Sequence, residues 1–355
     1  MFRRIIIRIL LAPFSLIYGI IISLVNFSYD TGLLKASKFS VPVIGVGNLS
    51  IGGAGKTPHI EYIINMLKDY INVATLSRGY KRQTKGFRLV QTSDTALTVG
   101  DEPLQYRRKY PDIVVAVSES RAYAIPQIIQ NYPQTQAILL DDSFQHRGVK
   151  PGLNILLTAY DTLFTDDYLL PAGRLREWRS GYRRADIIVV SKCPEDITMQ
   201  DRDRILVKIQ AMPYQKVFFS SYEYDYPYYF YDPEKRISLD LELEVILLSA
   251  IANTDYLFKY LEKNVHGVNE IEYADHHNFD SRDIEKIIKI YQNTKADRKI
   301  ILTTEKDAMR LEMHKSLLQK LNIPVFILPA KVKFHFDGGR EFDESVKKFL
   351  LDFEV

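Results

Sequence analysis

The stretch Val43-Ile-Gly-Val-Gly-Asn-Leu-Ser-Ile-Gly-Gly-Ala-Gly-Lys-Thr-Pro58 decides the fold. Its apolar start is typical of a buried strand, and the residues after Lys56 have the apolar spacing of a helix. A strand that ends in glycines and leads into a helix directs backbone N–H groups and the helix N-terminus at one point, which suits a phosphate. The common phosphate-loop pattern needs Gly where this chain has Ser50, but the neighbouring glycines restore flexibility. We expect the phosphate cradle to consist of Gly52, Gly53, Ala54, Gly55, Lys56, Thr57 and Pro58.

Two further features fit a bound nucleotide with Mg²⁺. In a loop of this type, Lys56 reaches the β- and γ-phosphates and the Thr57 hydroxyl holds Mg²⁺. The run AILLDDSFQHR places Asp141 and Asp142 at the carboxyl end of an apolar strand, where open α/β sheets bind ligands. Paired acids at a strand end are also common in turns. The pair therefore indicates a metal site only in combination with the phosphate loop. Together they predict a metal-nucleotide site.

The rest of the chain alternates Val- and Ile-rich runs with amphipathic segments. This alternation predicts an α/β protein with a doubly wound, mostly parallel sheet like that of P-loop NTPases. A shorter second series, EVILLSAIA, RKIILTTEKDA and IPVFILPA, predicts a smaller α/β domain. We place a nucleotide-binding domain at residues 31–215, an extended two-stranded linker at 216–240 and the smaller domain at 241–355. We interpret the tyrosines of the linker as packing residues of a hairpin rather than as ligand-stacking residues.

Residues 1–30 form a segment of their own. Arg3, Arg4 and Arg8 accompany an apolar run that is long enough to cross a bilayer. The run is too long for a cleaved signal peptide, and a spanning helix with its arginines inside would remove the nucleotide site from the cytoplasm. We therefore expect a membrane-associated helix, broken near Pro13, on the cytoplasmic face. The alternative is a buried core helix.

Composition narrows the class of protein. A chain of 355 residues with 46% hydrophobic residues has material for two domains. The net charge of +3 argues against a general nucleic-acid binder. The single cysteine, Cys193, excludes a disulfide framework within the chain and a multi-cysteine zinc site. We expect a monomer in a reducing compartment.

Polar clusters stand where loops are expected to leave the strands. They are SRGYKR (77–82), GDEP (100–103), SESR (118–121) and PAGRLREW (171–178). Each alone is typical of a solvated loop. Together they predict a crevice in which Arg121, Arg174 and Arg176 bind phosphoryl oxygens, with Asp101, Glu102 and Glu177 available as a base or as metal ligands.

The motifs GNLSIGGAGKTP, SRGYKR, GDEP, DDSFQHR, PAGRLRE, ADHHNFD and TEKDA follow one another beneath an N-terminal apolar helix. In this order they resemble the tetraacyldisaccharide 4'-kinase family of the lipid A (lipopolysaccharide) pathway, over nearly the whole chain. The resemblance implies an inner-membrane P-loop kinase that uses ATP and Mg²⁺. Its implied acceptor is the 4'-hydroxyl of a tetraacylated glucosamine disaccharide 1-phosphate. The family's own loop has the GGxGKTP form, which accounts for Ser50.

The resemblance also implies roles for particular residues. Lys56 and Thr57 would contact the nucleotide phosphates and Mg²⁺, and Asp101 would be the base that faces the sugar hydroxyl. His276 of ADHHNFD would assist Asp101 from the second domain. Because Asp101 stands in a loop of the first domain and His276 in the second, we expect this pair to meet only when the crevice between the domains closes.

The remaining implied roles concern the metal and the phosphoryl groups. Asp142 and Glu177 would serve Mg²⁺, and Arg121 and Arg176 would bind phosphoryl groups. The chain departs from the family at Ser143, Ala274 and Trp178, where Gly, Pro and Pro are usual. The last departure weakens the placement of Glu177.

Two alternatives remain open at this point. His276 and His277 are adjacent and lack a third ligand at metal spacing, so a zinc site is disfavoured against a loop histidine capped by Asp275. A membrane-bound, nucleotide-switched partner protein of the GTPase type would need an Asn-Lys-x-Asp-like run, and SKCPED at 191–196 is only a partial match. The kinase hypothesis is preferred.

Overall fold

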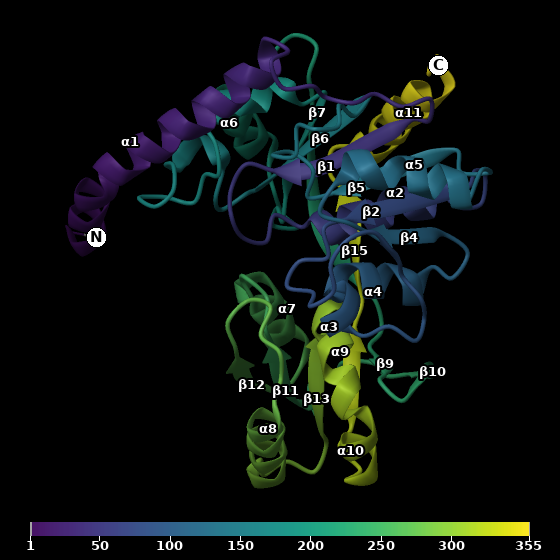
Figure 1. Ribbon diagram of the computed structural model, residues 1–355. Coiled ribbons are helices and arrows are strands. Elements are labelled where there is room, and N and C mark those ends of the chain that lie inside the picture. Colours follow the sequence, from purple (N-terminus) through teal and green to yellow (C-terminus); the bar gives the residue numbers. More distant parts are fainter. Residues whose placement is uncertain (1, 355) are drawn as a thin grey trace.

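The computed structural model describes residues 2–354, with side chains from Ile6 onward, and has two sheets in that part of the chain. The larger sheet has the strand order β15-β8-β7-β6-β1-β5-β2-β4-β3 (Figure 1). The strands from β8 to β4 are parallel, and the edge strands β15 and β3 are antiparallel. The strands are β1 Val43–Asn48, β2 Val73–Ser77, β3 Arg88–Leu89, β4 Val114–Val117, β5 Ala137–Asp141, β6 Leu153–Ala159, β7 Ile187–Ser191, β8 Lys216–Tyr224 and β15 Ala330–Phe334.

Helices cover both faces of this sheet, which confirms the doubly wound α/β prediction. The central strands are buried on both sides, so their side chains divide between one apolar cluster on one face and two on the other. α2 (Lys56–Leu67), α4 (Asp101–Lys109) and α11 (Gly338–Leu351) pack on one face. α5 (Arg121–Asn131) and α6 (Met199–Ile209) pack on the other. The short elements are α3 Ala96–Val99, η1 Phe164–Asp166 and η2 Arg179–Arg184.

The smaller sheet has the order β10-β9-β14-β13-β11-β12 and lies below the larger one in Figure 1. α7 packs on one face, and α8, α9 and α10 pack on the other. Its strands are β9 Tyr228–Tyr229, β10 Asp232–Arg236, β11 Glu244–Ser249, β12 Gly267–Glu272, β13 Lys299–Thr304 and β14 Val325–Leu328. Its helices are α7 Asp255–Asn264, α8 Ser281–Asn293, α9 Glu305–Leu311, η3 Glu312–His314 and α10 Lys315–Lys320.

The connection between the domains differs from the expected linker. β8 completes the parallel part of the larger sheet, whereas β9 and β10 join the smaller sheet. The chain then returns, because β15 pairs antiparallel with β8 and α11 packs on the larger sheet. Residues 330–354 therefore belong to the nucleotide-binding domain, although we expected them in the smaller one. Phe342 and Val346 of α11 are fully buried there, which explains the return.

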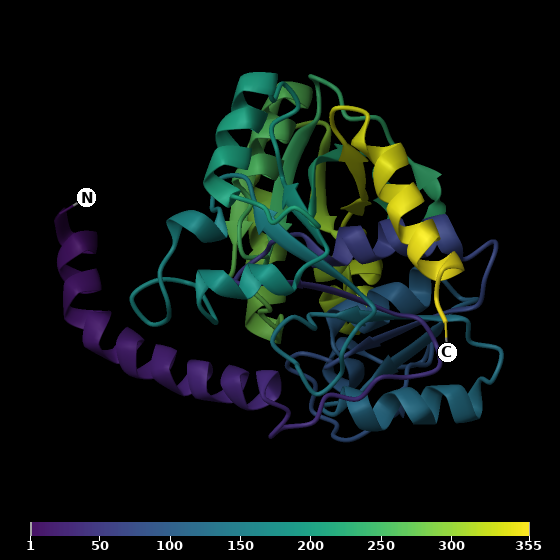
Figure 2. The same cartoon turned by 90° about the horizontal axis from the view of Figure 1, so that it is seen from above.

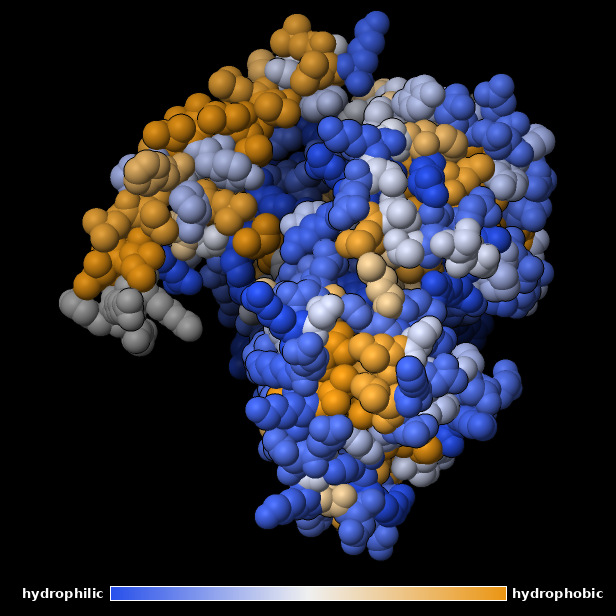
Figure 3. All heavy atoms as spheres, turned by 60° about the horizontal axis from the view of Figure 1, so that its bottom comes forward, coloured by the Kyte–Doolittle hydropathy of each residue, from blue (hydrophilic) through white to orange (hydrophobic). Residues whose placement is uncertain are grey.

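Helix α1 spans Phe2–Asp30 and extends away from the rest of the molecule (Figures 1 and 2). It continues through Pro13, so the expected break is not present. From Ile6 to Asp30 it is long and apolar enough to cross a membrane, and only 6% of its most apolar window is buried. That exposure excludes a core helix. Its surface is largely hydrophobic in Figure 3, in contrast to the mixed surface of the two domains.

Candidate active site

The phosphate loop joins β1 to α2 in a conformation that requires glycine. Gly52 and Gly55 have φ angles of 108° and 82°, and Gly55 is the N-cap residue of α2. A Cβ at Gly55 would lie 2.2 Å from the Tyr222 hydroxyl oxygen. The loop thus brings its backbone N–H groups to the N-terminus of α2, as the sequence predicts for a phosphate site.

Lys56 begins α2 and faces the acid at the end of the neighbouring strand. Its Nζ lies 3.4 Å from Asp142 Oδ1 and 3.2 Å from Asn48 Oδ1. Arg176 contacts the same carboxylate with both Nη atoms, at 3.0 and 2.9 Å. Burial alone would raise the pKa of Asp142, but Lys56 and Arg176 outweigh it and hold this pKa well below its usual range. The aspartate is therefore ionised and close to two cations that suit phosphoryl oxygens.

Asp141 has a different environment, although it is the adjacent residue. It is buried, and its Oδ2 accepts a hydrogen bond of 3.0 Å from the Tyr106 hydroxyl. Its Oδ1 has no hydrogen-bond partner within the described chain. Burial raises the pKa of Asp141 to about 6, and the Glu102 carboxylate adds to this effect. An ionised, half-satisfied carboxylate at this position is the kind of group that a divalent cation compensates.

Arg121 is the second buried group with spare hydrogen-bonding capacity. Its Nε and Nη1 have no partner among residues 2–354, and its Nη2 makes only a long contact of 3.5 Å to the Asp141 carbonyl. Burial lowers the pKa of Arg121 to about 10, which still leaves it charged at neutral pH. An unpaired guanidinium that lines a cavity indicates an anionic ligand.

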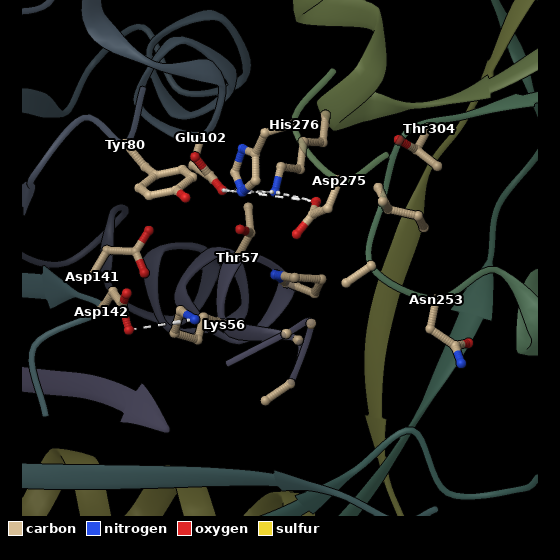
Figure 4. A pocket seen from close by; sticks show the side chains of 18 of the residues that line it. Lys56, Thr57, Tyr80, Glu102, Asp141, Asp142, Asn253, Asp275, His276 and Thr304 are labelled. Atoms are coloured by element: carbon tan, nitrogen blue, oxygen red, sulfur yellow. Dashed lines mark hydrogen bonds and ion pairs between the residues drawn. The ribbon is translucent and has the colours of Figure 1, made fainter. Parts of the chain in front are cut away.

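These groups open into one cavity of about 740 Å³ between the two domains (Figure 4). In the close-up, Lys56, Asp141 and Asp142 lie on one side and Glu102, Asp275 and His276 on the other, with Thr57 between them. Of the predicted site residues, the lining includes Gly52, Gly53, Ala54, Gly55, Lys56, Thr57, Pro58, Arg121, Asp142, Arg176 and His276. The volume is sufficient for a nucleotide and part of an acceptor.

Asp101 and His276 meet across the domain boundary, as predicted. His276 Nδ1 lies 3.1 Å from Asp101 Oδ2. Asp101 is the first residue of α4 and is buried, and it does not line the cavity, whereas His276 does. His276 has a φ of 57°, and its backbone N–H donates to the Ala250 carbonyl at 3.1 Å. The backbone thus presents the imidazole to α4 from the second domain.

Two cations of α9 complete this pair, and the sequence analysis assigned them no role. Arg310 donates to Asp101 Oδ2 and lies 3.2 Å from His276 Nδ1. Lys306 Nζ lies 2.8 Å from Glu102 Oε1 and 3.2 Å from His276 Nε2. Burial lowers the pKa of His276, and the Lys306 ammonium lowers it further. The TEKDA motif contains Lys306, but only the folded chain shows what the lysine faces.

Asp101, Glu102 and His276 have ligand atoms within 4.8 Å of one another, a spacing that suits a metal ion. The set does not fit a cation, however. Lys306 and Arg310 already donate to these carboxylates and would repel a divalent ion placed among them. The donor set on the other side of the cavity fits better, because Thr57, Asp141 and Asp142 supply the hard oxygen ligands that Mg²⁺ prefers.

Glu177, expected near the metal, lies apart from the cavity lining. Its buried carboxylate accepts hydrogen bonds from Arg184 at 2.7 and 2.8 Å and from Gln145 at 2.9 Å. Gln145 also donates to the Asn48 carbonyl at 2.9 Å. In this geometry Glu177 supports the loops around the phosphate site and has no place among the metal-facing oxygens.

The aromatic end of the cavity contains further residues without an assigned role. Tyr222 and Tyr224 of β8 line the cavity together with Tyr256 of α7, so the linker tyrosines do more than pack in a hairpin. Lys192 Nζ lies 4.3 Å from the centre of the Tyr256 ring. Burial lowers the pKa of Lys192 to about 8. A flat aromatic surface beside a phosphate loop suits a nucleotide base.

Comparisons with known proteins identify the family of the chain. The sequence model of the family described as Tetraacyldisaccharide-1-P 4'-kinase matches residues 7–350. The tetraacyldisaccharide 4'-kinase of Bacteroides thetaiotaomicron is 41% identical over 354 residues, which cover 96% of this chain and 93% of that protein. The Flavobacterium johnsoniae protein of the same name is 42% identical over 347 residues, 97% of this chain and 98% of that one. A crystal structure of "apo" form LpxK from Aquifex aeolicus in complex with ATP superposes with a TM-score of 0.71 at 29% identity, over 97% of this chain and 99% of that chain.

Proposed function

The chain belongs to the tetraacyldisaccharide 4'-kinase family, and we propose that it transfers the γ-phosphate of ATP to the 4'-hydroxyl of a tetraacylated glucosamine disaccharide 1-phosphate. Family membership confirms the resemblance inferred from the motifs and makes the protein a kinase. The observation that carries the proposal is the single cavity that combines the phosphate loop with His276 of the second domain. The switch-protein alternative loses its basis, because the relatives are named as kinases.

The phosphate side of the cavity binds the nucleotide and stabilises charge. Lys56 and Arg176 bind phosphoryl oxygens, and Arg121 offers its unpaired N–H groups to the same region. Thr57 and Asp142, together with Asp141, would hold Mg²⁺. When bound, that ion neutralises phosphate charge and orients the transferring group. Because Asp142 is the common counter-ion of Lys56 and Arg176, nucleotide phosphates compete with it for both cations.

The opposite side of the cavity handles the proton of the acceptor hydroxyl. We expected Asp101 to face the sugar, but His276 is the member of the pair that lines the cavity. The lowered pKa of His276 keeps the imidazole neutral at pH 7, so its Nε2 can accept a proton. Asp101 then fixes the ring through Nδ1 and stabilises the imidazolium. Lys306 must leave Nε2 when the hydroxyl approaches, and its ion pair with Glu102 at 2.8 Å remains available to it.

Helix α1 places this cavity at a lipid surface. Its exposed apolar residues fit association with the cytoplasmic face of the inner membrane, where both ATP and a membrane-bound acceptor are present. Arg174 of the 171–178 segment lines the cavity, and Tyr168, close to that segment, lies under Arg8 of α1. A lipid acceptor can therefore enter next to α1 without leaving the membrane. We propose that the protein acts there as a monomer.

The test is direct transfer of label. Purified protein in detergent is incubated with γ-labelled ATP, Mg²⁺ and a disaccharide lipid monophosphate, and the lipid is extracted and analysed. We expect label in a bisphosphorylated lipid, with none when the 4'-hydroxyl is blocked. The Lys56→Ala protein is the control for contaminating kinases. Label released only as phosphate, with intact lipid unlabelled, would overturn the proposal.

A further inference from the structure

Helix α1 has two chemically different faces, and one of them does not face lipid. Ser15, Tyr18, Gly19 and Ser23 recur at a spacing that places them on one side of the helix. This side packs against residues 167–178, which we call the strap. The exposed side carries large apolar residues, among them Leu10, Phe14, Leu16, Ile17, Ile20, Ile21 and Leu24. A membrane anchor needs only the apolar side, so the polar side has another role.

The polar face is tied to the strap by directed hydrogen bonds. Ser15 Oγ donates to the Leu169 carbonyl at 3.1 Å and accepts from the Ala172 N–H at 3.0 Å. The Tyr18 hydroxyl donates to the Arg176 carbonyl at 2.7 Å. Ser15 is buried, so its bond to the Leu169 carbonyl is shielded from water. These hydrogen bonds fix the strap at both of its ends.

Trp178 at the end of the strap makes two further hydrogen bonds to α1. Its Nε1 donates to the Gly19 carbonyl at 3.1 Å and to Ser23 Oγ at 2.9 Å. A Cβ at Gly19 would lie 2.5 Å from the Trp178 ring, so glycine permits the close approach. Trp178 is the only tryptophan in the chain.

The other side of the strap holds the residues that lead into the phosphate loop. Arg176 N–H donates to the Leu49 carbonyl at 2.7 Å, and Ile51 N–H donates to the Arg174 carbonyl at 2.7 Å. Ser50 and Leu175 form an antiparallel bridge between these two bonds. Arg176 thus contacts α1 through its carbonyl oxygen and the phosphate loop through its N–H. Its side chain also holds a carboxylate of the phosphate site.

We propose that α1 is a positioning element of the nucleotide site as well as a membrane anchor. Tyr18 and Trp178 fix the strap, and the strap fixes Arg176 and the residues that lead into the phosphate loop. A small displacement there misplaces the groups that bind the phosphates, which is costly for transfer. Because coupling between two sites is reciprocal, nucleotide binding also strengthens the docking of α1 onto the strap. The kinetic part of this proposal rests on the proposed kinase function.

The experiment separates anchoring from positioning. The strap variant is the double substitution Tyr18→Phe with Trp178→Phe, which removes two hydrogen-bond donors and leaves an aromatic ring at each position, a smaller one at 178. The anchor variant is Leu16→Ala with Ile20→Ala on the exposed apolar side. We expect the strap variant to lower kcat/KM for ATP by about three- to tenfold in detergent micelles, the range for one or two lost hydrogen bonds. Its sedimentation with lipid vesicles should match that of the unmodified protein.

The anchor variant should show the opposite pattern, with weaker vesicle binding and unchanged kcat/KM for ATP in micelles. Calorimetric titration with an ATP analogue, without lipid, measures the nucleotide site even if the chain fails to phosphorylate the proposed acceptor. Weaker binding by the strap variant, with an unchanged melting temperature, supports positioning. If the double variant loses its fold, Tyr18→Phe alone is measured in the same way. Unaltered nucleotide binding and unaltered kcat/KM in the folded strap variant would overturn the proposal.

Discussion

The two sides of the cavity differ in how far the protein satisfies its own charges. On the phosphate side, Asp141 and Arg121 are buried with polar atoms that have no partner within the described chain. On the interdomain side, Asp101 pairs with Arg310, and Glu102 pairs with Lys306. The unpaired polar atoms of the first region raise the free energy of the folded protein, and a bound metal-nucleotide would lower it. The second is compensated mainly by the protein itself, and Asp275 Oδ1 is its only buried carboxylate oxygen without a hydrogen-bond partner within the described chain.

This difference indicates which region binds the ligand and which region positions the side chains that react with it. Buried charges without partners favour a bound ligand, so substitutions on the phosphate side should change ligand affinity and the stability of the protein. Ion pairs hold the interdomain side chains in one arrangement, so substitutions on the interdomain side should mainly change kcat. The predictions below test this division.

The largest effect is expected for the Asp101–His276 pair. Asp101→Ala and His276→Ala should each lower kcat by about 10² to 10⁴, the range for a positioned general base, with little change in ATP affinity. The double variant should be scarcely worse than the poorer single variant, because residues that act as one unit are non-additive. Steady-state kinetics with a nucleotide-binding titration measures both quantities.

The neighbouring His277 supplies the control for this pair. It contacts Asp283 of α8 at 2.7 Å and does not line the cavity, so His277→Ala should keep kcat near its unmodified value. Multiplicative losses in the double variant would show that Asp101 and His276 work independently and that they do not form an interdomain dyad.

On the phosphate side, Lys56→Ala should cut turnover by about a hundredfold or more, since Lys56 neutralises charge on the transferring group. Nucleotide binding should weaken as well, which distinguishes this variant from those of the dyad. Lys68→Ala, at the far end of α2, is the matched control because Lys68 contacts only Asp69 there. Wild-type turnover in folded Lys56→Ala protein would remove the loop from the mechanism.

The same contrast explains what the sequence could predict. The phosphate loop is a local feature, since Gly52 to Thr57 are contiguous and their conformation follows from glycine and the strand-to-helix junction. Lys306 and Arg310 act on residues some two hundred positions earlier, and no local pattern indicates which carboxylates they reach. The polar GDEP cluster indicated Asp101 as a base or metal ligand, but its role at the sugar hydroxyl and its partner His276 came only from the family resemblance.

The return of the chain at β15 escaped prediction for a related reason. The run that ends at Phe334 has ordinary strand composition, and only its pairing with β8 assigns it to the larger sheet. The sequence placed Glu177 near the metal because a carboxylate beside an arginine-rich loop resembles a metal ligand, but the cavity lining does not include its side chain. In the fold, Arg184 and Gln145 satisfy it. Pairing between distant segments is fixed by packing, which periodicity does not encode.

A third prediction concerns stability on the phosphate side. The pKa of Asp141 is raised to about 6 in the folded protein, so the folded state binds this proton more tightly than the unfolded state does. Protonation therefore contributes its full stabilisation below the unfolded pKa, and this stabilisation is lost as pH rises through 6. At pH 7.5, Asp141→Asn should therefore raise the free energy of unfolding by about 1–3 kcal/mol and weaken Mg²⁺-dependent activity. The gain should vanish near pH 4. Asparagine keeps the acceptor for Tyr106.

Asp142→Asn is the matched control, and its effect has the opposite sign. Lys56 and Arg176 hold the pKa of Asp142 below its usual range, so the ionised carboxylate stabilises the fold at all pH values above the unfolded pKa. Thermal melts of both variants across pH 4–8 measure the difference. Equal effects of the two substitutions would show that the phosphate side does not carry the expected excess of buried charge.

The smallest expected effect is on the interdomain side and concerns the influence of Lys306 on the pKa of His276. Lys306 lowers the pKa of His276, after burial, so removing its charge in Lys306→Met should raise that pKa. A neutral His276 is the proton acceptor, so activity is lost as pH falls through this pKa. The acid limb of kcat/KM should therefore move to higher pH, by a few tenths to about one unit, for a neighbouring charge removed. Lys331→Met, an exposed lysine paired with Asp225, is the control and should leave the limb in place. An acid limb that stays fixed in Lys306→Met, while that of His276→Gln disappears, would mean that Lys306 holds Glu102 and leaves the histidine's proton affinity unchanged.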